Sequence, residues 1–246
     1  MKFLQKTSTF LVFVLVFIGC ASNNSISQND VFGLKVENVS EGILLTFNNI
    51  PAETTWIFIT IDNKNSVPIL TEFKGTQLKQ LKETGKVICP FVQQGCHYNI
   101  YANLYNDSNG ITEIAKIDTE ITAKNGIQIL NDITLGLNET QTELMLSSEP
   151  VFSTNVDYDF QKYSYMITLL LEETTDWNEL FKDNFFDRIY KKYPEITFNV
   201  SINDVSNNSI QSNDLLACFR AFCRLNYDNI VWEVGIAKSN EVILTP

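Results

Sequence analysis

Residues 98–105 read Tyr-Asn-Ile-Tyr-Ala-Asn-Leu-Tyr, so aliphatic or small side chains alternate with polar and aromatic ones. An earlier run at residues 56–61, Trp-Ile-Phe-Ile-Thr-Ile, alternates in the same way. A period of two is that of a β-strand, because successive side chains point to opposite faces of a sheet. Both segments are therefore predicted to be strands with one aliphatic face turned towards a core.

Runs of this kind continue on both sides, from residue 31 to about residue 124, and turn-forming residues separate them. The turn at residues 106–110, Asn-Asp-Ser-Asn-Gly, consists of residues that tolerate a positive φ. We therefore predict an all-β sandwich domain over residues 31–124, with only a weak helical turn at Thr76–Glu83. The predicted strands are Leu34–Val39, Gly42–Phe47, Trp56–Ile61, Val67–Phe73, Lys86–Phe91, Tyr98–Tyr105 and Thr112–Ile121.

The pattern changes after residue 125, and no strong internal repeat is visible. Aromatic and aliphatic residues recur at every fourth position within 176–192, which indicates a helix. Residues 125–246 are predicted to form an α+β domain with two helices and a mainly antiparallel sheet. Its expected elements are strands Ile127–Leu135, Thr142–Leu146, Tyr163–Glu172 and Ile196–Asn203, helices 176–192 and Asp214–Leu225, and a final hairpin of Ile230–Ala237 with Glu241–Leu244.

The second of these helices, Asp214–Leu225, is apolar on nearly every side, which favours a buried core helix. Arg220 and Arg224 share its one polar stripe. That stripe is expected to face solvent, and binding of an anionic ligand is the alternative.

The amino-terminal residues are predicted to form a targeting signal. Lys2 and Lys6 precede an apolar run at residues 10–19, which at about ten residues is too short to span a bilayer. The run ends in Phe17-Ile18-Gly19-Cys20, which resembles the lipobox of bacterial lipoproteins. The resemblance implies a signal peptide at 1–19, lipid attached to Cys20, a polar tether at 20–30 and a location in the cell envelope on a membrane. The alternative is an ordinary secretory signal with an incidental cysteine.

Two segments of the sandwich domain resemble a fibronectin type III or immunoglobulin-like module. Gly42–Phe47, with Pro51 soon after, is similar to the second strand of such a module, and Tyr98–Leu104 to the penultimate strand. The resemblance implies that residues 56–61 and 98–105 are neighbouring strands.

In that arrangement one outer face of the sheet carries four aromatic side chains, namely Trp56, Phe58, Tyr101 and Tyr105. A large aromatic patch is rarely left bare. Its cover is either the second domain, which makes these residues interdomain core, or a glycan or peptide ligand.

Composition excludes several functions. The 246-residue chain has a net charge of −11 and three arginines, which argues against nucleic-acid binding. His97 is the single histidine, which argues against a Ser-His-Asp triad and against a multi-histidine zinc site, and no Gly-rich phosphate loop or HExxH motif occurs. We therefore expect no catalysis, metal or cofactor. A carbohydrate-active enzyme with paired carboxylates is the weak alternative.

Four cysteines remain if Cys20 is lipidated. Cys89 and Cys96 flank a plausible turn, and an oxidising envelope would allow a disulfide between them. Cys218 and Cys223 would lie too far apart on a helix to be bridged and are expected to be reduced and buried.

These features together predict a lipid-anchored binding or adhesion module of the cell envelope, held to the membrane by its lipid. Its partner would be a glycan or a protein of the envelope. The alternative is a structural or assembly lipoprotein that binds other envelope proteins.

Overall fold

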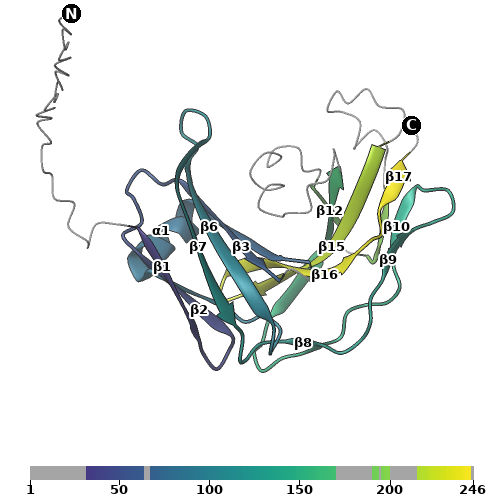
Figure 1. Cartoon of the computed structure of the whole chain (residues 1–246), viewed down its shortest axis with the longest axis horizontal. Helices are drawn as coiled ribbons and strands as arrows, with labels where there is room; N and C mark the ends of the chain where they lie inside the picture. Colours follow the sequence, from purple (N-terminus) through teal and green to yellow (C-terminus); the bar gives the residue numbers. More distant parts are fainter. Residues whose placement is uncertain (1–31, 64–66, 170–189, 194, 200–214, 245–246) are drawn as a thin grey trace, which may run out of the picture. The chain divides into compact units, whose positions relative to one another are not determined.

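The computed structural model describes residues 32–63, 67–169, 190–193, 195–199 and 215–244 (Figure 1). Residues Phe32–Pro246 form one compact unit, separate from Met1–Val31. The predicted signal peptide, Cys20 and the tether lie outside the described residues, as does most of the helix predicted at 176–192.

The first half of this unit is a β-sandwich, as predicted. Its three-stranded sheet has the order β1-β2-β5, and four more strands lie in the order β4-β3-β6-β7 within a larger sheet. The bounds are β1 (Gly33–Asn38), β2 (Ile43–Asn48), β3 (Trp56–Asp62), β4 (Ile69–Lys74), β5 (Lys86–Cys89), β6 (His97–Asn106) and β7 (Thr112–Thr122). Each predicted strand of this region is confirmed within a few residues.

A fibronectin type III-like arrangement follows from this strand order. β3 and β6 are antiparallel neighbours, as the resemblance implied, and Trp56 lies opposite Tyr105. Near the start of β6, the Tyr98 hydroxyl accepts a hydrogen bond from the backbone N–H of Gln93 at 2.8 Å. A tyrosine bonded back to the chain a few residues upstream is the corner that immunoglobulin-like sandwiches use before their sixth strand.

One helix, α1 (Gly75–Thr84), connects β4 to β5 and confirms the helical turn predicted there. It buries Leu78 and Leu81 and ends at Gly85, which adopts a left-handed conformation with φ 64°.

The described strands after residue 125 repeat the same order. The sheet β9-β10-β14 corresponds to β1-β2-β5, and β13-β12-β15-β16 corresponds to β4-β3-β6-β7. Their bounds are β9 (Leu135–Leu137), β10 (Glu143–Leu146), β12 (Asp159–Leu169), β13 (Tyr190–Tyr193), β14 (Thr197–Asn199), β15 (Leu215–Tyr227) and β16 (Ile230–Lys238). The chain therefore contains a structural repeat of two sandwiches that its sequence did not reveal.

The predicted α+β character of residues 125–246 is not confirmed, because the described part of that region contains strands and no helix. The helix predicted at Asp214–Leu225 is wrong, since these residues lie in β15 apart from Asp214, which is not described. Residues 190–192, predicted as the end of the first helix, belong to β13.

β15 looks helical in sequence because both of its faces are covered. Phe219, Ala221 and Cys223 are buried in the main core, and Phe222 is buried in a second apolar cluster. A central strand that is buried on both faces is apolar throughout and loses the alternation that identifies a strand.

Two further strand predictions differ in detail. The predicted final hairpin does not form, since β17 (Val242–Leu244) pairs with β15 beyond the point where β16 ends. The strand predicted at Ile127–Leu135 is reduced to β8 (Gln128–Ile129), which pairs with β11 (Phe152–Ser153), and to the first residue of β9.

The two sandwiches share one continuous sheet, because β16 of the second pairs with β4 of the first. The order can be followed in Figure 1 from β12 through β15 and β16 to β3, β6 and β7. Thr71 Oγ1 donates to the carbonyl of Val231 at 2.8 Å, and the Gly235 N–H donates to the carbonyl of Pro68 at 3.2 Å. The expected separation into two domains is therefore not confirmed by this arrangement.

The chain between the sandwiches is also held in place. The Gly95 N–H donates to the carbonyl of Ala123, and the Ile127 N–H donates to that of Val92, each at 2.8 Å. The ring of Phe91 packs edge-on against Tyr158, with centroids 5.9 Å apart. These contacts restrain the linker against the first sandwich.

Candidate functional site

The four aromatic residues predicted to share an outer sheet face divide into two pairs. Trp56 is 3% exposed and Phe58 is 8% exposed, whereas Tyr101 and Tyr105 are half-buried. Trp56 and Phe58 belong to an apolar cluster with side chains from β12 and β15, including Met166 and Phe222. They are thus positioned as core side chains, which is one of the two alternatives that their pattern left open.

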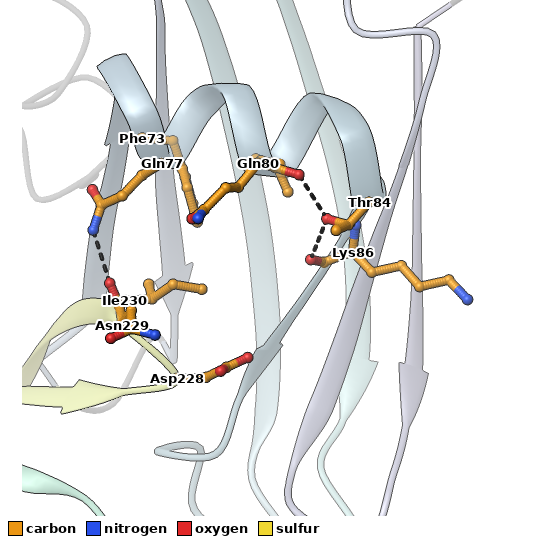
Figure 2. A pocket seen from close by; sticks show the side chains of 9 residues that line it. Phe73, Gln77, Gln80, Thr84, Lys86, Asp228, Asn229 and Ile230 are labelled. Atoms are coloured by element: carbon orange, nitrogen blue, oxygen red, sulfur yellow. Dashed lines mark hydrogen bonds between the residues drawn. The ribbon is translucent and has the colours of Figure 1, made fainter.

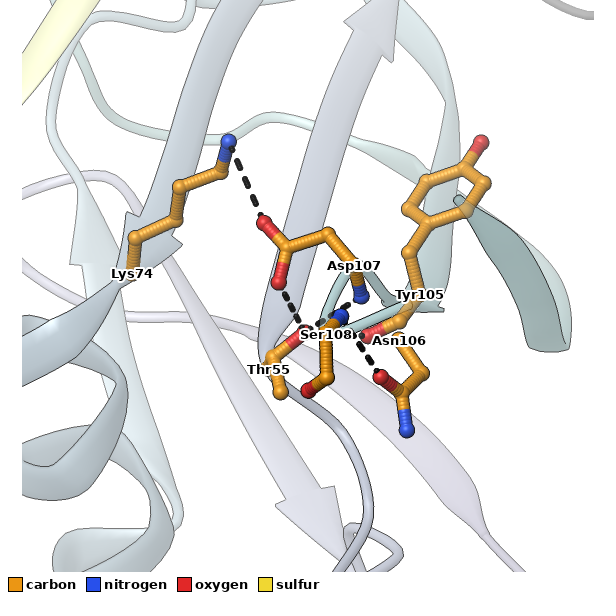
Figure 3. A network of polar contacts seen from close by, with 6 residues as sticks. All are labelled: Thr55, Lys74, Tyr105, Asn106, Asp107 and Ser108. Carbon is orange, nitrogen blue, oxygen red and sulfur yellow. Dashed lines mark hydrogen bonds and ion pairs between the residues drawn. The ribbon is translucent and has the colours of Figure 1, made fainter. Parts of the chain in front are cut away.

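Tyr105 lies at the rim of this cluster, with its ring centroid 4.9 Å from that of Trp56. Thr55 holds the neighbouring turn, because its N–H donates to the carbonyl of Tyr105 at 2.9 Å and its Oγ1 accepts from the N–H of Asp107 at 2.8 Å (Figure 3). Lys74 completes the network, with its Nζ 3.9 Å from Asp107 Oδ2 and 3.9 Å from the Trp56 ring centroid. The position of Tyr105 is therefore defined by polar and aromatic contacts together.

Tyr101 lies further along β6, opposite Asp118 of β7. The amine of Lys116 is 5.7 Å from the centroid of its ring, within the range of a cation–π interaction. Lys116 and Asp118 are both exposed, so the outer face here carries charges of both signs around a partly accessible tyrosine.

Asn103 lies between the two tyrosines on the same face and was missed in the sequence. It is 9% exposed, and its Oδ1 has no hydrogen-bond partner in the described part of the chain. A buried acceptor without a donor is costly and needs an explanation. Alternation along residues 98–105 places Asn103 on this face, so the pattern could have identified it.

A cavity of about 300 Å³ opens where α1 of the first sandwich approaches the β15–β16 turn of the second (Figure 2). Figure 2 shows Gln77 and Gln80 extending from α1 towards this turn. The Gln77 Nε2 donates to the carbonyl of Asn229 at 3.0 Å, which ties the helix to the turn. No residue of this cavity was singled out in the sequence as a candidate.

The arginines of β15 are not a solvated stripe. Arg220 is 5% exposed, and burial lowers its pKa while Cys218 and Asp62 oppose that shift. Arg224 is partly buried, with its Nε 3.6 Å from Glu233 Oε1. The helix prediction placed both arginines on a face exposed to solvent. They are buried or partly buried instead because β15 belongs to a sheet that is covered on both faces.

The predicted Cys89–Cys96 disulfide is absent, since both are free thiols. Cys89 is fully buried at the end of β5, where it interacts with the backbone N–H groups of Phe91 and Val92, and burial raises its pKa to about 12. Cys96 Sγ lies 3.8 Å from Gln93 Oε1. Both thiols lie close enough to Tyr98 to add to the rise in its pKa that burial causes.

Cys218 and Cys223 are free and buried. No disulfide was expected between them because of their distance along a helix, but both lie on the strand β15. Residues five apart along a strand point to opposite faces of the sheet, which keeps the two thiols apart. Cys218 Sγ lies 3.5 Å from the carbonyl oxygen of Ser239, to which it donates.

The described residues contain no group of three or more side chains suited to hold a metal ion. Within the same part of the chain, no helix has the length and apolarity that crossing a membrane requires.

No protein-family model matches the chain, and no curated protein is similar to it in sequence. The chain is similar to tandem fibronectin type III segments. A two-domain segment of chicken tenascin is 9% identical, covers 87% of this chain and 98% of its own, and has a TM-score of 0.30. The FN1–FN3 domains of chicken CNTN1 are 8% identical, with 88% and 66% coverage and a TM-score of 0.26. Since both scores are low, the fold assignment rests on the strand order.

Proposed function

We propose that this protein is a lipid-anchored binding module of a bacterial cell envelope and that it contacts a polypeptide partner through the outer face of β6 and β7. The observation that carries the proposal is the buried Asn103 acceptor between two partly accessible tyrosines. An N–H group of a partner that inserts between Tyr101 and Tyr105 would supply the missing donor.

The chemistry of this face favours a polypeptide over a glycan. Trp56 and Phe58 are buried, so the broad aromatic platform that would stack on sugar rings is not accessible. Tyrosine is enriched at protein interfaces, where aromatic anchors supply contact area, and the exposed Lys116 and Asp118 would belong to the polar rim that surrounds such an anchor.

The lipid anchor is proposed from the lipobox-like sequence ending in Cys20. Mass spectrometry of the native protein should find acyl chains on Cys20 as the first residue, and Cys20→Ser should move the protein from the membrane to the soluble fraction. An unmodified Cys20 with the leader still attached would contradict the anchor.

The binding face is tested by site-specific photo-crosslinking in intact cells. A photoreactive phenylalanine derivative at position 101 should give a discrete adduct, and at exposed Ile243 of β17 it should give none. Excess purified wild-type protein should compete for the adduct, whereas the purified Tyr101→Ala protein should compete at least about tenfold less well, as expected for a hot-spot residue.

Stability separates the two roles of the aromatic residues. Tyr101→Ala should leave the melting temperature within a few degrees of wild type, whereas Trp56→Ala should destabilise the fold by about 3–5 kcal/mol because it opens a cavity in a buried cluster. If Tyr101→Ala competes as well as wild type, the proposed face is wrong.

A further inference from the structure

The cavity beside α1 is formed by both sandwiches. α1 and β5 of the first contribute one wall, and the β15–β16 turn of the second contributes the other (Figure 2). Ligand sites occur preferentially at such junctions, because neither part alone encloses the space. This cavity is separate from the tyrosine face on β6.

Its floor is apolar and its walls are polar. Phe73, Leu81 and Ile230 supply the apolar part. On the walls, the Gln80 side chain and the Asp228 carboxylate make no hydrogen bond within the part of the chain that the structure describes. Gln77 donates through Nε2 to Asn229, which leaves its carbonyl oxygen as an acceptor.

The β15–β16 turn on the opposite wall has a defined backbone conformation. Asp228 and Asn229 both adopt left-handed conformations, with φ of 52° and 62°. Two consecutive positive φ values define the type I′ turn that suits a two-residue hairpin. The hydrogen bond from Gln77 to the Asn229 carbonyl fixes the backbone of this turn against α1, so the backbone positions of both walls are defined.

The charge of the lining limits the ligand. Lys86 lines the cavity, but Figure 2 shows its amine pointing away, so Asp228 is the charged group on the turn side. An anionic ligand such as a phosphate would meet a carboxylate and no cation. Carboxamides donate and accept at once, and a carboxylate accepts from hydroxyl groups, so the walls suit a neutral polyhydroxylated molecule.

We propose that this cavity binds one sugar ring, with its hydroxyl groups on Gln80, Asp228 and the Gln77 carbonyl and its C–H face on the apolar floor. The volume of about 300 Å³ lies at the lower end of the range for small-molecule sites, which fits a single ring rather than an extended oligosaccharide. The site is independent of the polypeptide face proposed above.

Saturation-transfer NMR on the full chain, with methyl glycosides of glucose, mannose and N-acetylglucosamine as probes, tests the proposal. At least one glycoside should show transfer at millimolar concentration. Gln80→Ala should weaken its binding about threefold to tenfold, the value of one neutral hydrogen bond. Asn229→Gly retains the turn and, because the tie uses only the main-chain carbonyl, should preserve binding.

A matched control is Gln94→Ala, which removes an exposed glutamine from the β5–β6 connection, away from the cavity. It should bind like wild type, as should Tyr101→Ala. The proposal is overturned if none of the glycosides shows transfer, if Gln80→Ala and Gln94→Ala bind equally, or if a capped dipeptide binds in a Gln80-dependent manner instead. Loss of binding in Tyr101→Ala would also overturn it, because the two sites would not be independent.

Discussion

The junction between the two sandwiches depends on Gly235, which has no side chain where β16 approaches β4. A Cβ at this position would lie 2.4 Å from both Cβ and Cγ1 of Val67 and 2.8 Å from the carbonyl oxygen of Pro68. Since these distances are far below van der Waals contact, Gly235→Ala must separate the strands. Overpacking costs about 1–3 kcal/mol and the lost hydrogen bond to Pro68 about 0.5–1.5 kcal/mol, so we expect a total of about 2–4 kcal/mol.

Thermal unfolding followed by circular dichroism measures this effect. For a chain of this size, the expected loss corresponds to a decrease in melting temperature of about 4–16 °C. Gly136→Ala is the matched control, because Gly136 also lies in a strand, β9, and a Cβ there meets nothing within 4 Å. If Gly235→Ala melts within about 1 °C of Gly136→Ala, then β16 and β4 do not approach as the structure indicates and the reasoning fails.

Two further predictions concern buried hydroxyl and thiol groups. Tyr98→Phe should lower the free energy of unfolding by about 1 kcal/mol, since it leaves the Gln93 N–H without its acceptor; urea unfolding at pH 7 checks this, and an unchanged midpoint would refute the role of the corner. Cys89 has a pKa of about 12 in the folded chain against 9.0 when unperturbed, so the unfolded state loses this proton first and stability falls as the pH rises from 9 to 12. Between pH 8 and 10.5, wild type should lose about 2 kcal/mol more than Cys89→Ala in urea unfolding, and parallel losses in the two proteins would contradict this assignment.

Local sequence predicted the first sandwich well. In residues 56–61 and 98–105, every second side chain belongs to an apolar core face, and the side chains between them are aromatic or polar. Short turns separate the strands. This pattern is sufficient because antiparallel strands that are close in sequence find each other through local turns. The resemblance to a fibronectin type III module then correctly paired the strands that contain Trp56 and Tyr105.

The second sandwich was obscured by burial on both faces. Phe219 and Phe222 point in opposite directions from β15, yet both are fully buried, so the run shows no alternation. An apolar segment of this length has the same composition in a buried helix and in a buried strand. The structural repeat was hidden for the same reason, because strand order is conserved between the halves while the side-chain pattern is not.

The candidate sites show a similar division. Tyr101 and Tyr105 could be assigned to one face from their spacing, but the burial of Trp56 depends on Met166 and Phe222, which are far away in sequence. The cavity beside α1 could not be anticipated, because Gln80 and Asp228 come together only through the packing of the two sandwiches.

What the residue order settles here is local: the seven strands and the short helix of the first sandwich, and the face to which each of their side chains belongs. These follow from backbone geometry and from contacts between near neighbours in the chain. Whether a mostly apolar segment becomes helix or strand, which aromatic rings are covered, and where the cavity opens depend on pairing between strands that are far apart in the sequence, such as β12 with β15 and β4 with β16. Tertiary packing decides these features, because the side chains concerned become buried only when strands that are distant in the sequence have paired.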